Sequence, residues 1–424
     1  MTPLRLNTLL HWFRSHDIVA AALVSLLLVV AVSFTTSPTP PSADSINYVN
    51  VAEQGLWNNP DLAAPFAYRF GTPLIVHAMS FLLSLSILAS FRLVVFLSVW
   101  GLCVLAYLLA RSAGGPIGSG LVITAVAAFS FFNVKFPLAV PTMVDAEGFL
   151  LFALAVWLLV TKRYGLALLT SCVGLFFKEF LLIPGALLIF EKAREYWKSR
   201  AASPLIWILA TVLLVGSCFV VPRILIGVST GYGANLKWIF PAQDHFGYFE
   251  NLRYFLSGSP NIGRIVNLVF SLASYWFPFL LLATPERVKM LSEEMGSLRW
   301  LIILLVLLVL VFALFGGTNI MIFVAYTLPA LVIALAFLLR LEVHWIELVA
   351  MLAAMFLFNR ISTFTGGMGM TSEDIVQFYG GWWTKLDVQT VLRTVELGCY
   401  LAGVAVVRVM LRRIKKASVA AGKG

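Results

Sequence analysis

Residues 93–110 read LVVFLSVWGLCVLAYLLA, an apolar run without a charged side chain. A helix needs about 20 apolar residues to cross the hydrocarbon core of a bilayer. Comparable runs recur along the whole chain. Because backbone polar groups in lipid must be satisfied within the spanning segment, and because the alternation of a barrel strand is absent, these runs predict helices. They lie at 18–34, 73–90, 93–110, 121–136, 149–160, 166–177, 180–190, 205–221, 265–283, 301–315, 320–339, 345–358 and 391–409.

The composition fits this pattern. Hydrophobic residues make up 60% of the chain and charged residues 12%, whereas soluble domains are about half apolar and a quarter charged. We therefore expect one integral membrane domain over residues 1–424, of the all-α polytopic class. Several runs are too short for a full crossing, which predicts about ten to thirteen transmembrane or re-entrant helices together with interfacial juxtamembrane helices. The first run is longer than a signal-peptide core and indicates a retained helix.

The net charge of +10 comes largely from basic clusters at 162–163, 192–200 and 412–416. Such clusters mark cytoplasmic faces by the positive-inside rule. No basic stripe with interleaved aromatic residues stands on a soluble element, so nucleic acid is not an expected partner. Membrane lipids are the expected surroundings.

Three polar stretches interrupt the apolar pattern, at residues 35–70, 223–264 and 359–390. The last two are too rich in aromatic residues for disordered linkers. They fit amphipathic segments at the membrane interface or loops folded over a site. The sequence leaves these alternatives open.

The stretch 35–70 contains the first candidate acid, Asp44, and ends near Arg69. Tyr48 and Ala52 follow Asp44 at helical spacing, which predicts a short juxtamembrane helix beginning near Ser42. Asp44 could simply cap that helix, and Arg69 could extend its charge to the interface. Yet a guanidinium has a planar fork that matches phosphate oxygens. An acid and a guanidinium at one water–lipid boundary are suited to chemistry on a lipid-borne phosphate.

Three more charged residues stand beside or within apolar sequence: Asp145, at the start of the run 149–160, and the adjacent pair Lys178 and Glu179. Asp145 could interact favourably with a helix N-terminus. Ionisable residues inside a membrane are functional candidates by default. Because neighbouring helical residues face different directions, we expect Lys178 to face an anionic ligand rather than Glu179.

The segments ADSINYVNVAEQGLW, AYRFGTPLIVHAM, VDAEGFLLFALAVWLL, FKEFLLIP and GGTNIMIFVAYTLP, in this order, resemble the GT-C superfamily of polytopic glycosyltransferases, including its bacterial mannosyltransferases. The resemblance covers about the first half of the chain and the region around Gly316. It implies a GT-C-like helical bundle. Asp44 would match the catalytic acid of the first extracytoplasmic loop. Tyr48, Arg69, Asp145, Lys178 and Glu179 would match substrate-binding positions.

The resemblance also implies a reaction. A polyprenyl-phosphate sugar would be the donor, and the acceptor would be a glycan, a lipid or a protein. Transfer would be an inverting displacement with Asp44 as general base, at the extracytoplasmic face of a bacterial inner membrane. No residue is assigned as a metal ligand. A divalent metal is compatible with the resemblance, although Asp44 is followed by Ser45 where many members carry a second acid.

Two other functions remain open. In a lipid-linked saccharide flippase or transporter, charges would line a path to both faces and Asp44 would be dispensable for bond formation. In an assembly or scaffold protein, Arg69 and Lys178 would pair with acids such as Glu179 or Asp44. A topological difficulty also arises, because counting every run as a crossing puts Asp145 on the opposite side from Asp44. One of the runs 73–90 and 121–136 must then be short or re-entrant.

Overall fold

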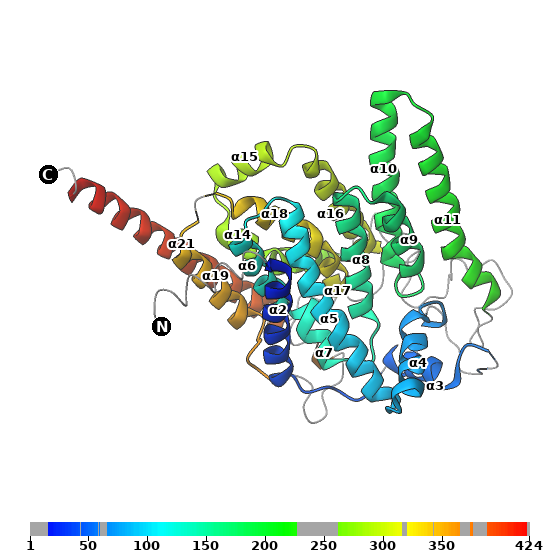
Figure 1. Ribbon diagram of the computed structural model, residues 1–424. Coiled ribbons are helices and arrows are strands. Elements are labelled where there is room, and N and C mark those ends of the chain that lie inside the picture. Colours follow the sequence, from blue (N-terminus) through cyan, green and yellow to red (C-terminus); the bar gives the residue numbers. More distant parts are fainter. Residues whose placement is uncertain are drawn as a thin grey trace.

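The computed structural model describes residues 16–42, 44–57, 59, 66–226, 262–315, 320–341, 343–364, 374–375 and 388–421. Every regular element in these ranges is a helix (Figure 1). The first half of the chain forms α2 (Asp17–Phe34), α3 (Asp44–Gln54), η1 (Phe66–Tyr68), α4 (Gly71–Leu83), α5 (Ile87–Ser112), α6 (Ile117–Ala128), η2 (Phe131–Lys135), α7 (Phe136–Ala139), α8 (Asp145–Val160), α9 (Tyr164–Gly174), η3 (Glu179–Leu181), α10 (Leu182–Ser199) and α11 (Ser203–Leu225). The second half forms α13 (Ile262–Tyr275), α14 (Phe277–Leu282), α15 (Pro285–Glu294), α16 (Leu298–Phe315), α17 (Ile320–Val324), η5 (Ala325–Thr327), α18 (Leu328–Leu338), α19 (Trp345–Phe358) and α21 (Val388–Ala421).

Five helical segments are long and apolar enough to cross a membrane, and the number rises to seven if each of two bent pairs is one span. The chain is therefore an integral membrane protein, and the predicted helical class is confirmed. The larger count of ten to thirteen helices stays a prediction, as does the GT-C arrangement of the bundle. Shorter apolar helices, among them α4 and α9, accompany the long ones.

The apolar run 73–90 is not one helix. It contains the end of α4 and the start of α5. Ser84 adopts a left-handed conformation with φ of 52° directly after α4. The hydroxyl of Ser86 then accepts a hydrogen bond from the backbone N–H of Ala89 at 3.2 Å, which caps the first turn of α5. The chain thus turns within this run, and α5 makes the crossing.

The run 121–136 is broken as well. Helix α6 ends at Ala128, and the short segment η2–α7 continues at a bend of 66°. Asn133 fixes the break, since it accepts a hydrogen bond from the Ser130 hydroxyl at 2.9 Å and donates one to the carbonyl of Ala325 at 3.3 Å.

These breaks explain how Asp44 and Asp145 can lie on the same side of the membrane. Of the helices between Asp44 and Asp145, α5 and α6 run along the bundle, whereas α4 stays at the end where α3 lies (Figure 1). Helix α8 therefore begins, with Asp145, at the same end of the bundle as α3. The run 73–90 is the one that does not span, and the sequence had offered it as an alternative.

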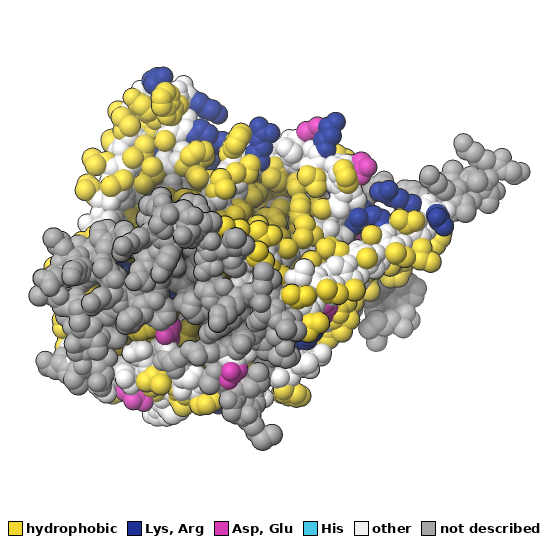
Figure 2. Space-filling view, turned by 180° about the vertical axis from the view of Figure 1, so that it is seen from behind, with side chains coloured by type: hydrophobic (Ala, Val, Ile, Leu, Met, Phe, Trp, Pro, Cys, Tyr) yellow, Lys and Arg dark blue, Asp and Glu magenta, His cyan; other side chains and the backbone are white. Residues whose placement is uncertain are grey.

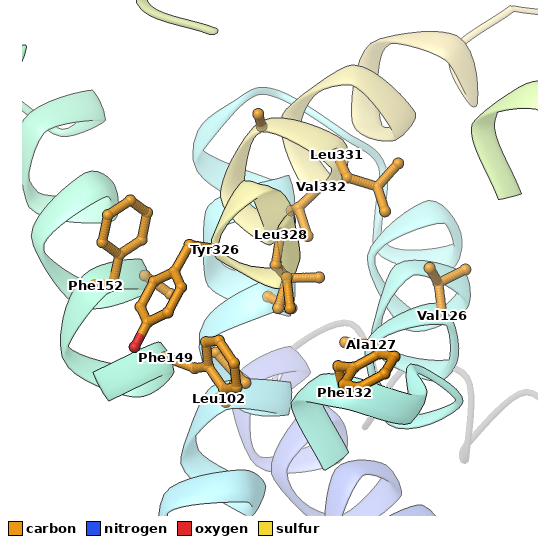
Figure 3. Packing of buried hydrophobic residues seen from close by; sticks show 14 of the residues in the cluster. Leu102, Val126, Ala127, Phe132, Phe149, Phe152, Tyr326, Leu328, Leu331 and Val332 are labelled. Atoms are coloured by element: carbon orange, nitrogen blue, oxygen red, sulfur yellow. The ribbon is translucent and has the colours of Figure 1, made fainter. Parts of the chain in front are cut away.

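The centre of the bundle is the segment α17–η5–α18, whose apolar window is 100% buried. Its side chains contact those of α5, α6 and α8 (Figure 3). Small residues such as Ala330, Ala334 and Ala336 allow neighbouring helices to approach closely. By contrast, the apolar window of α11 is only 17% buried. Seen from behind, Lys and Arg side chains gather along the upper edge of the molecule, above a largely hydrophobic band (Figure 2).

Candidate functional site

Arg69 lies in the turn between η1 and α4, and its guanidinium joins two elements that are far apart in sequence. Its Nε lies 3.0 Å from both carboxylate oxygens of Glu179, the first residue of η3. A second guanidinium nitrogen donates to the hydroxyl of Tyr48 on α3, at 2.9 Å. Arg69 therefore fixes α3 against the start of α10.

A second guanidinium reaches the same carboxylate. Arg223, in the last turn of α11, lies 3.6 Å from Glu179 and stacks over the ring of Tyr68 at 4.9 Å. Burial raises the pKa of Glu179, but Arg69 and Arg223 outweigh that effect and lower the pKa to about 2. Glu179 is therefore an anion at neutral pH. The sequence indicated Arg223 only as the edge of a polar stretch, because nothing in its neighbourhood predicts a partner on η3.

Lys178 and Asp145 form a separate buried ion pair. The Lys178 Nζ lies 2.6 Å from Asp145 Oδ1, and the two side chains are 6% and 1% exposed. Lys178 is extended, with φ of −159°, so its side chain and that of Glu179 diverge. Lys178 and Glu179 therefore pair with different partners, and that Lys178 faces an anionic ligand stays a prediction. The partner of Lys178, however, is an acid of the chain itself.

The second carboxylate oxygen of Asp145 is available to a ligand. Its Oδ2 is buried and has no hydrogen-bond partner among the described residues. A buried acceptor without a partner costs about 1–3 kcal/mol. A ligand hydroxyl or N–H that donates to this oxygen would remove that cost.

Asp44 is the first residue of α3 and lies within electrostatic reach of these groups. Burial raises its pKa above the ordinary value, Arg69 and Lys178 lower it, and Asp145 raises it. Within the described part of the chain, no hydrogen bond or ion pair engages its carboxylate. The backbone N–H of Ser42 donates instead to the Ser45 hydroxyl, at 2.7 Å. Ser45 thus holds the segment before α3 against its first turn, and no described backbone N–H donates to the Asp44 carboxylate.

Tyr326, in η5, forms the inner wall of this charged cluster, and sequence reasoning missed it. Its ring stacks on that of Phe180, with centroids 4.2 Å apart and planes at 13°. Its hydroxyl is buried and has no hydrogen-bond partner among the described residues. The only signal was the Gly-rich segment before Pro329, of which residues 316–319 lie outside the described part.

Glu147, two residues after Asp145, has a different role. It accepts hydrogen bonds from Thr72 at 3.0 Å and Ser98 at 3.3 Å. These contacts tie α8 to α4 and α5. Together with the hydrogen bond from the Gly71 N–H to the Phe176 carbonyl, at 2.8 Å, they hold Arg69 beside Lys178 and Glu179.

The structure thus brings Asp44, Tyr48, Arg69, Asp145, Lys178 and Glu179 to one end of the bundle. Most of the two long polar stretches, at 227–261, 365–373 and 376–387, lies outside the described residues. In the described part, no three His, Cys, Asp or Glu side chains are grouped to hold a metal ion. Asp145 and Glu179 each pair with a cation of the chain itself.

The chain matches no protein family model, no curated protein and no solved structure.

Gly148 provides a test of how tightly this cluster is packed. A Cβ at this position would lie 2.5 Å from the Tyr326 hydroxyl and 3.2 Å from the Lys178 Cβ. We expect Gly148→Ala to lower the free energy of unfolding by about 1–3 kcal/mol, as overpacking does, and to displace Lys178 from Asp145. Thermal unfolding of the purified protein in detergent measures the first effect.

Gly216→Ala is the matched control, because nothing lies within 4 Å of a Cβ there, in the interior of α11. Alanine should stabilise α11 slightly, by about 0.5–1 kcal/mol. Equal stability of the two variants would show that Tyr326 and Lys178 do not pack against Gly148.

Proposed function

We propose that this protein is a membrane glycosyltransferase of GT-C type that transfers a sugar from a polyprenyl-phosphate donor to an acceptor hydroxyl. The observation that carries the proposal is the state of Asp44. Its carboxylate is largely buried, has no direct partner in the described residues, and interacts electrostatically with Arg69 and Lys178. A general base must accept the proton of the attacking hydroxyl, which a carboxylate without a direct partner can do. The cations beside it can bind the leaving phosphate.

The cations suit a phosphate leaving group. Arg69 and Arg223 lie beside Glu179, and Lys178 pairs with Asp145. When Asp44 is ionised, the positive and negative charges of the cluster cancel. When a phosphate approaches, Arg69 and Lys178 would give up part of their contacts with Glu179 and Asp145. They would form charge-assisted hydrogen bonds to the phosphate oxygens instead. Arg223 would keep Glu179 paired during the exchange.

In the proposed reaction, the acceptor oxygen attacks the anomeric carbon, and the bond between that carbon and the phosphate oxygen breaks. The hydroxyl proton passes to Asp44, and the electron pair of the broken bond leaves with polyprenyl phosphate. A single displacement inverts the configuration at the anomeric carbon. Tyr48 would orient Arg69, and the unpaired oxygen of Asp145 would accept a hydrogen bond from a sugar or acceptor hydroxyl.

The surroundings of the cluster support a lipid-borne donor. Helix α4 begins next to Arg69 and exposes large apolar side chains, with Phe81 and Leu82 exposed by 82% and 74%. Exposed apolar surface of this kind is typical of a face in contact with lipid. An isoprenoid chain could lie along it while its phosphate reaches Arg69.

The distribution of charges supports an extracytoplasmic position of the cluster. Asp145 begins α8, and Lys162 and Arg163 follow its other end. The positive-inside rule puts that basic end in the cytoplasm, so the charged cluster would face the extracytoplasmic side. The bacterial inner membrane as location comes only with the resemblance to the GT-C superfamily.

The direct test uses purified protein in proteoliposomes with synthetic polyprenyl-phosphate sugars and soluble or lipid acceptors. Formation of free polyprenyl phosphate together with a glycosylated acceptor is the expected result. Movement of the intact donor between leaflets without any new glycosidic bond would identify a flippase or transporter instead.

The ion pairs favour a second candidate, a membrane scaffold. Arg69 pairs with Glu179 and Lys178 with Asp145, which is the pairing expected of charges with a purely structural role. A scaffold would neither transfer nor move the donor. It would also tolerate substitution of Asp44, which contributes no direct contact to the described structure.

The pH dependence of transfer tests the role of Asp44 as a base. The base must be ionised, and its pKa is raised above the ordinary 3.8. The acid limb of kcat/KM should therefore lie above pH 3.8, with activity falling as pH drops through it. Since Arg69 lowers this pKa, the residual activity of Arg69→Gln should show an acid limb at higher pH. In the wild type, Glu179 has a pKa of about 2, so it does not produce that limb. An unchanged limb in Arg69→Gln would assign it to another group.

A further inference from the structure

The hydroxyl of Tyr326 lies over the first turn of α8, close to Asp145. A Cβ at Gly148 would lie 2.5 Å from this hydroxyl oxygen. Asp145 is three residues before Gly148, so the two positions share one face of α8. In Figure 3, the Tyr326 oxygen points toward the start of α8, away from Phe152. Asp145 is also the charge that acts most strongly on the Tyr326 hydroxyl.

Both groups lack a partner in the described part of the chain. The Tyr326 hydroxyl and Asp145 Oδ2 are buried, and neither makes a hydrogen bond to any described residue. They therefore do not bond to each other either. Each residue is 1% exposed. Because buried polar groups are normally satisfied, two such groups beside each other are suited to a ligand.

The chemistry of the two groups selects the kind of ligand. A carboxylate only accepts hydrogen bonds, so a group that binds Asp145 Oδ2 must donate. The Tyr326 hydroxyl can donate to the oxygen of that same group. A hydroxyl donates and accepts through one atom and fits both partners. The phosphodiester of a polyprenyl-phosphate sugar has no O–H, so it cannot donate to Asp145.

Lys178 connects these two groups to the position proposed for the phosphate. Its Nζ lies 2.6 Å from Asp145 Oδ1. In the proposed reaction, Lys178 turns from Asp145 toward the phosphate, and the space that its ammonium leaves lies beside the Asp145 carboxylate. The donor sugar is joined directly to the phosphate, so one of its hydroxyls can enter this space. The acceptor hydroxyl approaches Asp44, on α3, instead.

We propose that Tyr326 and Asp145 together bind one hydroxyl of the donor sugar. Tyr326 donates to the hydroxyl oxygen, and Asp145 Oδ2 accepts a hydrogen bond from the hydroxyl. Tyr326 is thus a specificity-determining residue, which distinguishes the sugar-bearing carrier from polyprenyl phosphate alone. The inference rests on the proposed function, because its ligand is the proposed donor.

The surroundings of Tyr326 allow its hydroxyl to be removed alone. The ring stacks on Phe180 at 4.2 Å and contacts the ring of Phe149, with centroids 4.6 Å apart. Phenylalanine keeps these contacts. Since the hydroxyl has no described partner, Tyr326→Phe should unfold at the temperature of the wild type when no ligand is present.

The test compares four lipids in thermal unfolding of the purified full-length protein in detergent. They are polyprenyl phosphate alone and the same carrier bearing mannose, glucose or galactose. At equal concentrations, at least one sugar-bearing lipid should raise the unfolding temperature of the wild type more than the bare carrier does. Tyr326→Phe should respond to the bare carrier as the wild type does, but bind the preferred sugar-bearing lipid about 2- to 10-fold more weakly.

Tyr107→Phe is the matched control. The Tyr107 hydroxyl donates to Asp17 at 3.0 Å, near the other end of α5. This variant should unfold at a lower temperature than the wild type because it loses a hydrogen bond, yet it should keep the wild-type preference for the sugar-bearing lipid.

The outcomes separate this inference from the proposed function. If none of the four lipids stabilises the wild type, the proposed function fails, and this inference fails with it. If the bare carrier stabilises the wild type and no sugar adds to the effect, the phosphate site stands and the hydroxyl site is overturned. An undiminished sugar preference in Tyr326→Phe would also overturn it. So would a lower unfolding temperature of ligand-free Tyr326→Phe, which would show that the hydroxyl is already satisfied.

Discussion

Asp44→Asn should reduce sugar transfer by roughly 100- to 10,000-fold, the usual contribution of a general base. Asparagine has nearly the same shape but cannot accept the acceptor's proton. No described residue bonds directly to the Asp44 carboxylate, so the substitution removes no hydrogen bond or ion pair from the described part of the protein. The loss should appear in kcat, while donor binding and the unfolding temperature stay close to those of the wild type.

Glu53→Gln is the matched control for this experiment. Glu53 is an exposed acid on the same helix, α3, and its substitution should leave transfer unchanged. Asp44→Asn at wild-type activity would remove Asp44 from the mechanism. A parallel loss of activity and stability in Asp44→Asn would point to a structural role instead.

Arg69→Lys should lower kcat/KM by about 100- to 1,000-fold, which corresponds to the 2.7–4 kcal/mol typical of a lost electrostatic contact in a transition state. A lysine ammonium is a point charge without the planar fork of a guanidinium. It cannot bond both oxygens of Glu179 and the Tyr48 hydroxyl while it also holds a phosphate.

Arg92→Lys is the control for this charge-conserving change, since Arg92 is exposed on α5. The double variant Arg69→Lys with Glu179→Gln separates two roles of Arg69. If Arg69 acts on the phosphate, removing Glu179 cannot restore transfer. If Arg69 only neutralises Glu179, the double variant should regain most of the activity and the stability lost in Arg69→Lys.

The sequence predicted the helical membrane class because long apolar runs have few alternatives in a bilayer. It also predicted the short helix after Ser42, which the structure has as α3. It indicated that one of the runs 73–90 and 121–136 is short or re-entrant, but it did not locate the breaks at Ser84 and after Ala128, because apolar residues continue through both. Ser86 was a usable signal, since a serine before a helical run is a common N-cap.

The candidate residues come together, but their pairing could not be predicted. Arg69 and Glu179 are 110 positions apart, and Lys178 could have paired with any nearby acid. Only the direction of the chain at Lys178 decides that it faces Asp145. Arg223 and Tyr326 were missed for a related reason. Their place at the site depends on where α11 ends and on the packing of η5, not on neighbouring residues in sequence.

The bridge between Arg69 and Glu179 has a consequence for how the protein is made. During synthesis, Arg69 enters the membrane region well before the segment that contains Glu179 has left the ribosome. Until then its guanidinium stands at the lipid boundary without this carboxylate. A nascent chain that stalls before η3 therefore lacks this ion pair, and α3 and α4 are joined to the later helices only when η3 has been synthesised.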